Sequence, residues 1–578
     1  MSNYLLRAIT LLALTFTTLT TFAEDWVKES DANTALVLQE QGRFSPESAS
    51  SLGLEAYDGG VMDLKPEVYG RAMASSRELL ATLRERRKTV ENPKVLQDLD
   101  ILIQAVEDTV TSSTLSHDKM LPYYNIPQAL YYGFHSLLDP RTDPKRYPAA
   151  LERLAKYTGP EPITELAEAR TEERFAVPGL IGPFKGEVER DLENLPRFLQ
   201  GMRQLFTDSG LKGWEEAYGT LEKQLNEYGD WVRTEMLPRA RTDHRLPPEI
   251  YADNLKNFGV RAKPEDLIST AEFGFQEIRA EMKTVARQVA AQRGWENGEL
   301  MHVMAELKKD QIPPDQVLDI YKQRLASIED IIREHDIITL PERPANIRLA
   351  TEAESASIPA PFMSPPQLIG NTGQYGEFVL VQHNPSLQGK AAQMDDWSHQ
   401  AITWALTVHE ARPGHELQFS RLIEDGTSQA RAIYAFNSAN VEGWGLYAEA
   451  IMLEYLPLDG QLFTLMARLQ RAARMFLDPM VNLGQMTPDE AVTFMREQVG
   501  LSEAMARSEA DRYSFLAPGQ ATAYYYGYMN LQRLRTEVEM KLGDRFKQRK
   551  YHDFVLAQGL LPPDLLRQAV LEEFIPAQ

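Results

Sequence analysis

Two histidines and a glutamate lie close together in a chain that has few histidines. The sequence has 10 histidines in 578 residues, and two of them, His409 and His415, are separated by five residues that begin with Glu410. Metallopeptidases with a His-Glu-x-x-His motif bind zinc through two histidines on one helix face, while the glutamate activates zinc-bound water. His409 and His415 are therefore candidate zinc ligands, and Glu410 is the candidate general base.

The spacing of the two histidines exceeds that of the standard motif by two residues. Six residues of a regular helix turn through about 600°, which would place His415 about 120° away from His409 around the axis. Pro413 and Gly414 lie between them, and this pair can interrupt a helix. We expect a break or bulge that brings the two imidazoles together. The alternative is that His415 caps a helix or is a buried structural histidine.

A third ligand is expected from a second helix. Glu442 follows His409 by 33 residues and lies near the start of an amphipathic segment, Asn440–Glu449. In zincins with a glutamate ligand, such a carboxylate completes three protein ligands and leaves one position open for water. Glu442 is the candidate ligand. Glu449 lies seven residues later on the same helical face, where it either orients a ligand or is a surface residue.

Composition limits the chemistry further. The chain has no cysteine, which excludes disulfides, thiol nucleophiles and cysteine-bound metals, so any metal must bind His, Asp or Glu. There are 61 Lys and Arg against 83 Asp and Glu, a net charge of −22. This balance argues against nucleic acid as a partner, because phosphate binding requires a cationic surface. The sequence contains no motif that indicates an oligomeric state.

The N-terminus has the pattern of a secretory signal peptide over residues 1–23. One cation, Arg7, precedes an apolar, threonine-rich run over residues 8–19, and Ala23 marks the expected cleavage position. The run is too short and too rich in hydroxyl groups for a membrane span, and no cysteine follows it to carry a lipid. We expect a periplasmic or secreted protein that leaves the membrane after signal cleavage.

The hydrophobic pattern predicts a mainly α-helical protein. Residues 24 to about 60 mix polar and turn-forming types. From about Pro66, apolar residues recur every three or four positions over most of the chain. We expect residues 24–578 to form a single unit of two lobes, with a boundary near residues 245–260. The helices expected before His409 are Arg71–Arg86, Asn92–Thr111, Pro148–Lys156, Lys185–Asp208, Leu211–Leu237, Lys263–Arg293, Leu300–Lys308 and Pro314–His335.

A small β-sheet is predicted just before the segment that contains His409 and His415. Residues 347–385 are rich in proline and glycine turns and include a β-rich piece, Glu377–Gln382. An extended substrate would pair with the edge of the stretch Gly376–Asn384, as zincins commonly bind peptides. His383 in this stretch either contacts the substrate or has a capping or surface role.

Three segments resemble a bacterial family known as domain of unknown function 885. They are His409–His415, Glu442–Glu449 and Ala517–Tyr524, and matching patterns at Phe44–Glu47 and Tyr551–Asp553 extend the resemblance over nearly the whole mature chain. That family is similar to helical gluzincin peptidases such as angiotensin-converting enzyme and thimet oligopeptidase. The resemblance implies a two-lobed helical shell around a deep channel.

The same resemblance implies roles for individual residues. His409, His415 and Glu442 map to zinc ligands and Glu410 to the general base, and the insertion of Pro413-Gly414 is shared by the family.

By analogy with related helical zincins, Tyr524 donates a hydrogen bond to the oxyanion that forms during amide hydrolysis. Tyr525, Tyr526 and Tyr528 leave this assignment open, because an aromatic cluster can also form core or pocket wall. Arg512 and Arg474 either bind a peptide carboxylate or form structural ion pairs.

Together these features predict an exported, zinc-dependent metallopeptidase that hydrolyses short peptides. Two alternatives remain open. The first is a zinc hydrolase that acts on another amide or ester, because the resemblance constrains the site more than the substrate. The second is an inactive, metal-free descendant that binds peptides or a partner protein. The joint presence of His409, Glu410, His415 and Glu442 favours an enzyme.

Overall fold

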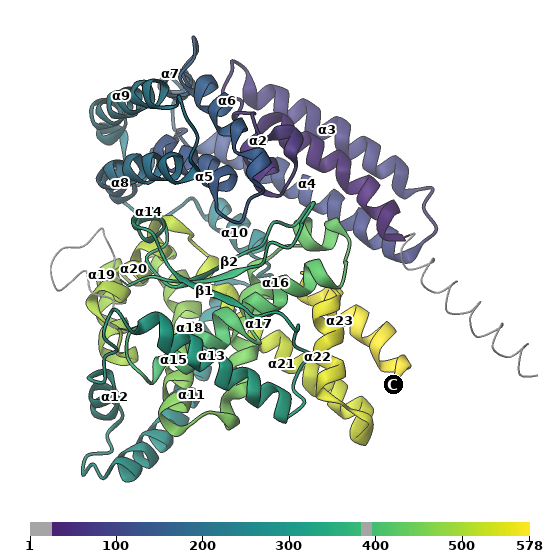
Figure 1. The fold of residues 1–578 in the computed structure, drawn as a ribbon, viewed down its shortest axis with the longest axis vertical. Helices are drawn as coiled ribbons and strands as arrows, with labels where there is room; N and C mark the ends of the chain where they lie inside the picture. The colour runs from purple at the N-terminus through teal and green to yellow at the C-terminus, as the bar shows by residue number, and fades with distance from the viewer. Residues whose placement is uncertain (1–25, 383–395) are drawn as a thin grey trace, which may run out of the picture.

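The computed structural model describes residues 26–382 and 396–578. It is mainly helical with one small sheet, as the sequence predicts (Figure 1). The predicted signal peptide, residues 1–23, and His383 lie outside the described residues. In the part of the chain that the structure describes, no helix is both long enough and apolar enough to cross a bilayer.

The first part of the chain packs as a helical body, at the top of Figure 1. Its core contains buried side chains such as Leu130, Phe134, Phe198 and Met202. The body consists of a helix over residues 26–44, α2 (Pro46–Ser51), α3 (Val68–Arg87), α4 (Pro93–Lys119), α5 (Ile126–Leu138), α6 (Pro148–Tyr157), α7 (Ile163–Glu172), α8 (Lys185–Ser209) and α9 (Glu215–Trp231).

The helix over residues 26–44 differs from the sequence-based expectation of a turn-rich start. Val37 is buried and joins a cluster with Leu83 of α3 and Leu99 of α4. Long-range packing of one apolar face therefore stabilises a helix whose local composition is ambiguous.

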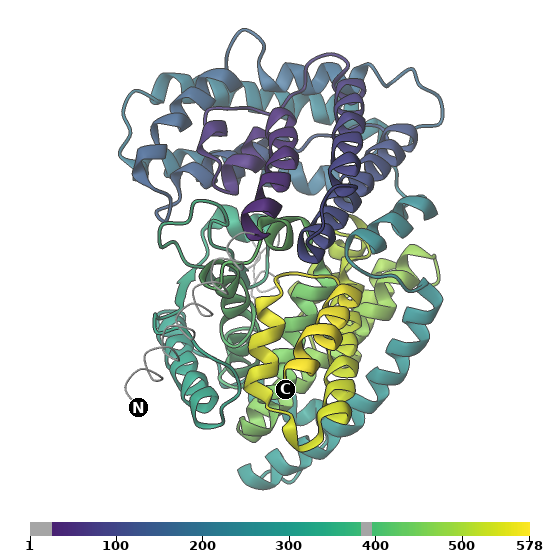
Figure 2. The ribbon, with the colours of Figure 1, turned by 90° about the vertical axis from the view of Figure 1, so that its right-hand side faces the viewer.

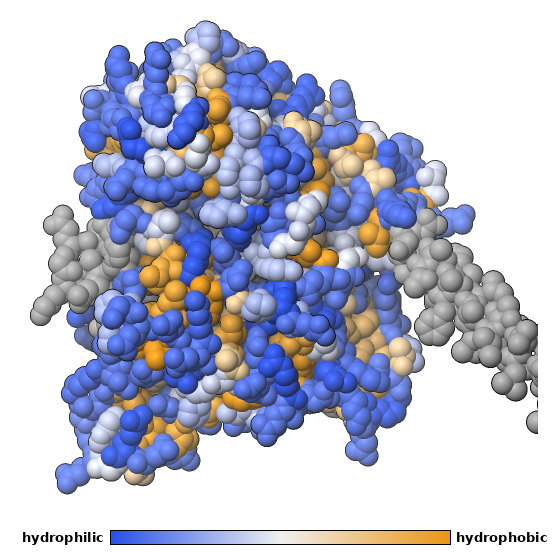
Figure 3. All heavy atoms as spheres, in the orientation of Figure 1, coloured by the Kyte–Doolittle hydropathy of each residue, from blue (hydrophilic) through white to orange (hydrophobic). Residues whose placement is uncertain are grey.

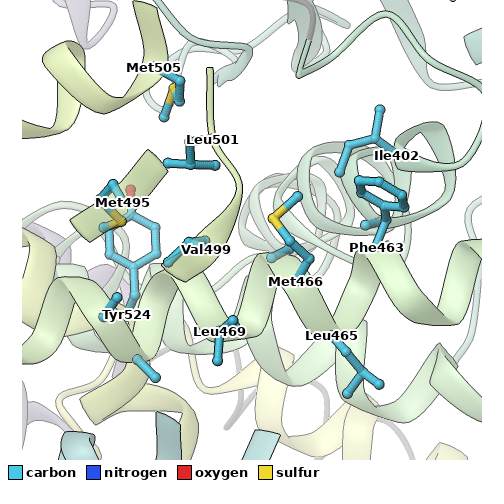
Figure 4. Close-up of a cluster of buried hydrophobic side chains, with 14 of the residues drawn as sticks. Ile402, Phe463, Leu465, Met466, Leu469, Met495, Val499, Leu501, Met505 and Tyr524 are labelled. Atoms are coloured by element: carbon cyan, nitrogen blue, oxygen red, sulfur yellow. The ribbon is translucent and has the colours of Figure 1, made fainter. Parts of the chain in front are cut away.

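The second part of the chain forms a larger helical body around α18, which is buried on nearly all sides. Figure 4 shows part of its core, including Phe463, Met466 and Tyr524. The chain passes from the first core to the second between Met236 and Tyr251. The helices are α10 (Pro248–Asn257), α11 (Pro264–Arg293), α12 (Leu300–Lys308), α13 (Val317–Glu334), α15 (Ile402–Leu406), α16 (His415–Glu424), α17 (Ser438–Met452), α18 (Leu458–Asn482), α19 (Pro488–Phe494), α20 (Glu503–Asp511), α21 (Ala523–Leu542), α22 (Gln548–Ala557) and α23 (Pro563–Ala569).

A three-stranded sheet interrupts the helices of the second body, between α13 and α15 in sequence. Its strands, β1 (Asn346–Leu349), β2 (Phe362–Ser364) and β3 (Glu377–Leu380), have the order β1-β3-β2, and the short helix α14 (Glu352–Ser357) follows β1. Strand β3 pairs in parallel with β1 and antiparallel with β2. The expectation that the stretch containing β3 offers a free edge is therefore wrong, because β3 is central. Strand β2 lies at one edge of the sheet.

The C-terminal helices pack against α17. Figure 2 shows them in yellow on the face turned toward the viewer. His552 of α22 is fully buried there. Its Nε2 lies 2.9 Å from the Tyr447 hydroxyl of α17, and its Nδ1 lies 2.8 Å from the carbonyl oxygen of Ile337. A neutral imidazole that donates from Nδ1 and accepts at Nε2 satisfies both contacts.

This contact predicts an acid-sensitive fold. Burial lowers the pKa of His552 to about 4, whereas a histidine in the unfolded chain titrates near 6.5. Between these values only the unfolded state binds the proton, so the free energy of unfolding should fall by about 2 kcal/mol from pH 7 to pH 5 on account of this residue. Urea unfolding of the parent and of His552→Gln at both pH values measures the difference. Equal losses in the two proteins would contradict the prediction.

Candidate metal centre

A break between two helices brings His409 and His415 together. Helix α15 continues as one π-helical turn, Thr407–Ala411, and α16 begins at His415. His409 thus lies at the end of one helix and His415 at the start of the next. Their ring centroids are 4.7 Å apart and the rings are nearly perpendicular, at 85°. The structure therefore contains the break that the Pro413-Gly414 insertion predicts.

Glycine and tryptophan hold this break in a tight turn. A Cβ atom on Gly414 would lie 1.9 Å from the carbonyl oxygen of His409, so no other residue fits without moving the backbone. From the next helix, the indole N–H of Trp444 donates to the carbonyl oxygen of Pro413 at 2.9 Å. The turn is thereby tied to α17, the helix that carries Glu442.

Buried ion pairs fix the turn on its other side. Arg412 is fully buried, and its Nε donates to Glu416 Oε2 at 2.8 Å. Another guanidinium nitrogen of Arg412 donates to Glu329 Oε1 of α13 at 2.5 Å. Arg343 donates to the second oxygen of Glu416 at 2.7 Å. Because each of these buried charges has a partner, the network can hold the turn without an uncompensated charge.

Glu442 completes a set of three donors. Its Oε2 lies 3.3 Å from His415 Nε2 and 3.5 Å from His409 Nε2. Zinc with bonds of about 2.0–2.1 Å in a tetrahedral arrangement separates its ligand atoms by about 3.3 Å. The distances from Glu442 to the two histidines are close to this separation, and imidazole nitrogen and carboxylate oxygen are donor types that zinc accepts. Glu410 lies beside them, since one donor atom from each of His409, Glu410 and His415 falls within 4.8 Å of the others.

Glu449 orients His409. Its Oε1 lies 2.7 Å from His409 Nδ1, which leaves Nε2 directed at Glu442. Of the two readings that the sequence left open for Glu449, the structure favours orientation of a ligand. Burial opposes a charge on His409, yet hydrogen bonds with Glu442 and Glu449 raise the pKa of the imidazole to about 9. The surrounding carboxylates thus favour the protonated form of this imidazole.

Gly445 makes room for the imidazole. It lies on α17 between the two glutamates, and a Cβ atom there would lie 2.5 Å from His409 Cε1 and 2.8 Å from Nε2. The ring can contact α17 this closely only because position 445 has no side chain.

The histidines line a cavity of about 440 Å³, which is the size of a small-molecule site. Glu410, Glu442 and Tyr524 line the same cavity. One wall is apolar and includes β2 and neighbouring residues, namely Ile358, Phe362, Met363, Leu368, Phe419 and Phe436. Burial raises the pKa of the Glu410 carboxyl, although the two histidines and Arg471 oppose the shift.

Tyr524 is the one member of its tyrosine cluster that reaches this cavity, whereas Tyr525 packs against Gly274 of α11. Burial, followed by the nearby charge of Glu442, raises the pKa of Tyr524, so the phenol keeps its proton. The loop before it is anchored by Asp478 of α18, whose carboxylate accepts from the backbone N–H of Gly519 at 2.9 Å.

The three arginines of the cavity differ in their partners. Arg474 forms a buried ion pair with Glu509, with N···O distances of 2.6 and 2.8 Å, so its role is structural. Arg512 donates to Gln520 Oε1 at 3.0 Å. Arg471, which the sequence reasoning missed, also lines the cavity. Its position one turn before Arg474 on a helix was the only signal that could have indicated it.

Gly445 provides a test of the metal geometry. In Gly445→Ala the new methyl group should push the His409 ring out of position and weaken zinc binding at least about tenfold, the scale of effects on groups that orient a ligand. Competition with a chromophoric zinc chelator measures the affinity. Gly219→Ala on α9 is the control, because a Cβ atom there meets nothing within 4 Å. Unchanged zinc affinity in Gly445→Ala would contradict the proposed site.

Comparisons with known proteins identify the family and the fold. The family model described as "Bacterial protein of unknown function (DUF885)" matches residues 46–570. No curated protein matches the sequence. Among solved structures, "a putative lipoprotein of unknown function from Shewanella oneidensis" aligns with a TM-score of 0.71 and 18% identity, covering 93% of this chain and 99% of that one. "The putative lipoprotein from Colwellia psychrerythraea" aligns with a TM-score of 0.72 and 18% identity over 95% and 99%. The likeness to these structures shows a shared fold, and the match over residues 46–570 shows that the chain belongs to the DUF885 family.

Proposed function

We propose that this protein is a zinc-dependent metallopeptidase that acts on short peptides. The observation that carries the proposal is the convergence of His409 Nε2 and His415 Nε2 on one oxygen of Glu442, at 3.5 and 3.3 Å, in the wall of a cavity. His409, His415 and Glu442 would hold the metal. When bound, zinc polarises the peptide carbonyl and lowers the pKa of water.

Glu410 is the proposed general base. It follows His409 directly, lies among the donor atoms of the site and faces the same cavity. Its carboxylate would take a proton from the attacking water and pass it to the leaving amine. Tyr524 would donate its phenolic proton in a hydrogen bond to the carbonyl oxygen as negative charge develops there.

The apolar wall and β2 supply a place for the peptide chain. Phe362 and Met363 of β2 line the cavity, and only one side of β2 pairs with β3. An extended peptide can add to the other side through backbone hydrogen bonds, which recognise a peptide without reading much of its sequence. A helical shell with a small sheet beside the metal-binding helices also supports the resemblance to gluzincin peptidases.

We further propose that the protein acts outside the cytoplasm. The signal-like pattern of residues 1–23 and the description of two similar structures as lipoproteins support this location. The present chain has no cysteine to carry a lipid, so the proposal is for a periplasmic or secreted form.

The Glu410→Gln variant tests the proposed chemistry. The amide keeps the shape of the side chain and cannot accept the proton, so kcat should fall by about two to four orders of magnitude while zinc remains bound. Hydrolysis of a library of short, unblocked peptides, followed by mass spectrometry, measures the activity. Elemental analysis of the same samples measures the zinc.

Glu442→Gln is the matched comparison for this experiment. It should lose both zinc and hydrolysis, because it removes a ligand rather than the base. Full turnover by Glu410→Gln would refute the role of that residue. Absence of hydrolysis in the zinc-loaded parent would refute the proposed function.

A further inference from the structure

The candidate site contains a buried cation, Arg471, that forms no ion pair with a carboxylate of the described residues. Arg471 on α18 is 6% exposed and lines the cavity of His409 and Glu410. Its hydrogen bonds to described residues go to two neutral acceptors, the carbonyl oxygen of Ala467 at 3.3 Å and Gln470 Oε1 at 3.2 Å. Its Nε is buried without a partner in the described part of the chain. Burying a guanidinium without a counter-ion costs free energy, and a bound anion would offset that cost.

The three arginines that line the cavity differ in whether a carboxylate neutralises them. Arg474, one turn after Arg471, is neutralised by Glu509. Arg512 is half-buried, lines the same cavity and contacts the neutral amide of Gln520. Within residues 26–382 and 396–578, neither Arg471 nor Arg512 forms an ion pair with a carboxylate. The two acids that line the cavity, Glu410 and Glu442, lie beside the two histidines of the candidate metal site. The arginine wall therefore has positive charge available for a ligand.

The distance to Tyr524 limits where such a ligand can place its negative charge. The Arg471 guanidinium carbon lies 6.0 Å from the centre of the Tyr524 ring. An extended peptide advances by about 3.5 Å per residue. An anion bound at Arg471 would thus lie one or two residues from a carbonyl group held at Tyr524.

We propose that Arg471, assisted by Arg512, binds the C-terminal carboxylate of a short peptide, so that the site releases one or two residues from the C-terminus. This inference rests on the proposed peptidase function and names its substrate class. Hydrolysis breaks the peptide C–N bond; water supplies the hydroxyl of the new carboxylate, and its proton goes to the released amine. A guanidinium matches a carboxylate with two parallel hydrogen bonds, which gives both affinity and register.

Binding measurements separate this inference from the proposed function. The probes are the tripeptide Ala-Ala-Phe, its C-terminal amide, and Ala-Ala-Glu amide, whose only carboxylate is a side chain. Calorimetry with zinc-loaded Glu410→Gln should give about ten- to hundredfold tighter binding of the free acid than of either amide. Hydrolysis of the same peptides by the parent protein should show a similar preference in kcat/KM.

Substitution of the arginines tests the assignment of the carboxylate. Adding Arg471→Gln to the Glu410→Gln background should remove most of the preference for the free acid, Arg512→Gln should reduce it, and Arg471→Lys should restore part of it. Arg468→Gln is the control: Arg468 lies on the same helix, is 8% exposed, has a buried Nε without a partner among the described residues and packs 5.3 Å from the Tyr528 ring, but it is not among the residues that line the cavity. It should keep the full preference.

The outcomes are distinct. Equal affinity for the acid and its amide, or an unchanged preference in folded Arg471→Gln, would overturn the carboxylate site. Ala-Ala-Glu amide binding as tightly as the free acid would overturn the C-terminal assignment. Binding that depends on Arg471 without hydrolysis by the parent would uphold the carboxylate site and refute the peptidase function.

Discussion

The candidate site depends on one geometric constraint, which is that two imidazole nitrogens and one carboxylate oxygen must converge to the spacing of metal ligands. His409 and His415 are too far apart in rotation on a continuous helix to meet it. The chain satisfies it by ending one helix at Ala411 and starting another at His415. Each stabilising contact around this turn serves that convergence. The buried guanidinium of Arg412 holds the turn to α13, and the indole of Trp444 holds it to α17.

Helix α17 carries the candidate ligand Glu442 and residues that position His409. Within two turns it provides Glu442, the contact surface at Gly445 and the carboxylate of Glu449 that fixes the ring of His409. The helix is buried on almost every side, so its position is set by the core. A centre built on packed helices can keep its donors in place before a metal or substrate arrives, which is a requirement for precise chemistry. Helix α18 contributes Arg471 and Arg474 to the cavity lining, and burial strengthens the interaction of the Arg471 charge with nearby groups.

The sequence predicted the features that local residue patterns determine. The Pro413-Gly414 pair predicted the break, and the regular spacing of apolar residues predicted helices such as α8 and α11 almost to their ends. Prediction from the sequence failed where packing between distant segments determines the local structure. The helix over residues 26–44 forms because Val37 reaches the core beside α3 and α4, and β3 became a central strand because β2, fifteen residues earlier, pairs with it. Arg471 could not be distinguished from Arg468 or Arg474, since only the fold determines which of them line the cavity and which have a carboxylate partner.

Metal content distinguishes a zinc centre from a metal-free cluster of buried polar side chains. The chain starting at Glu24 would be purified, dialysed against zinc and then against buffer, and measured by elemental analysis beside His409→Ala. About one zinc per chain is expected in the parent, as for three protein ligands and one open position, and almost none in the variant. Little zinc in the folded parent, or equal zinc in both proteins, would contradict the zinc centre.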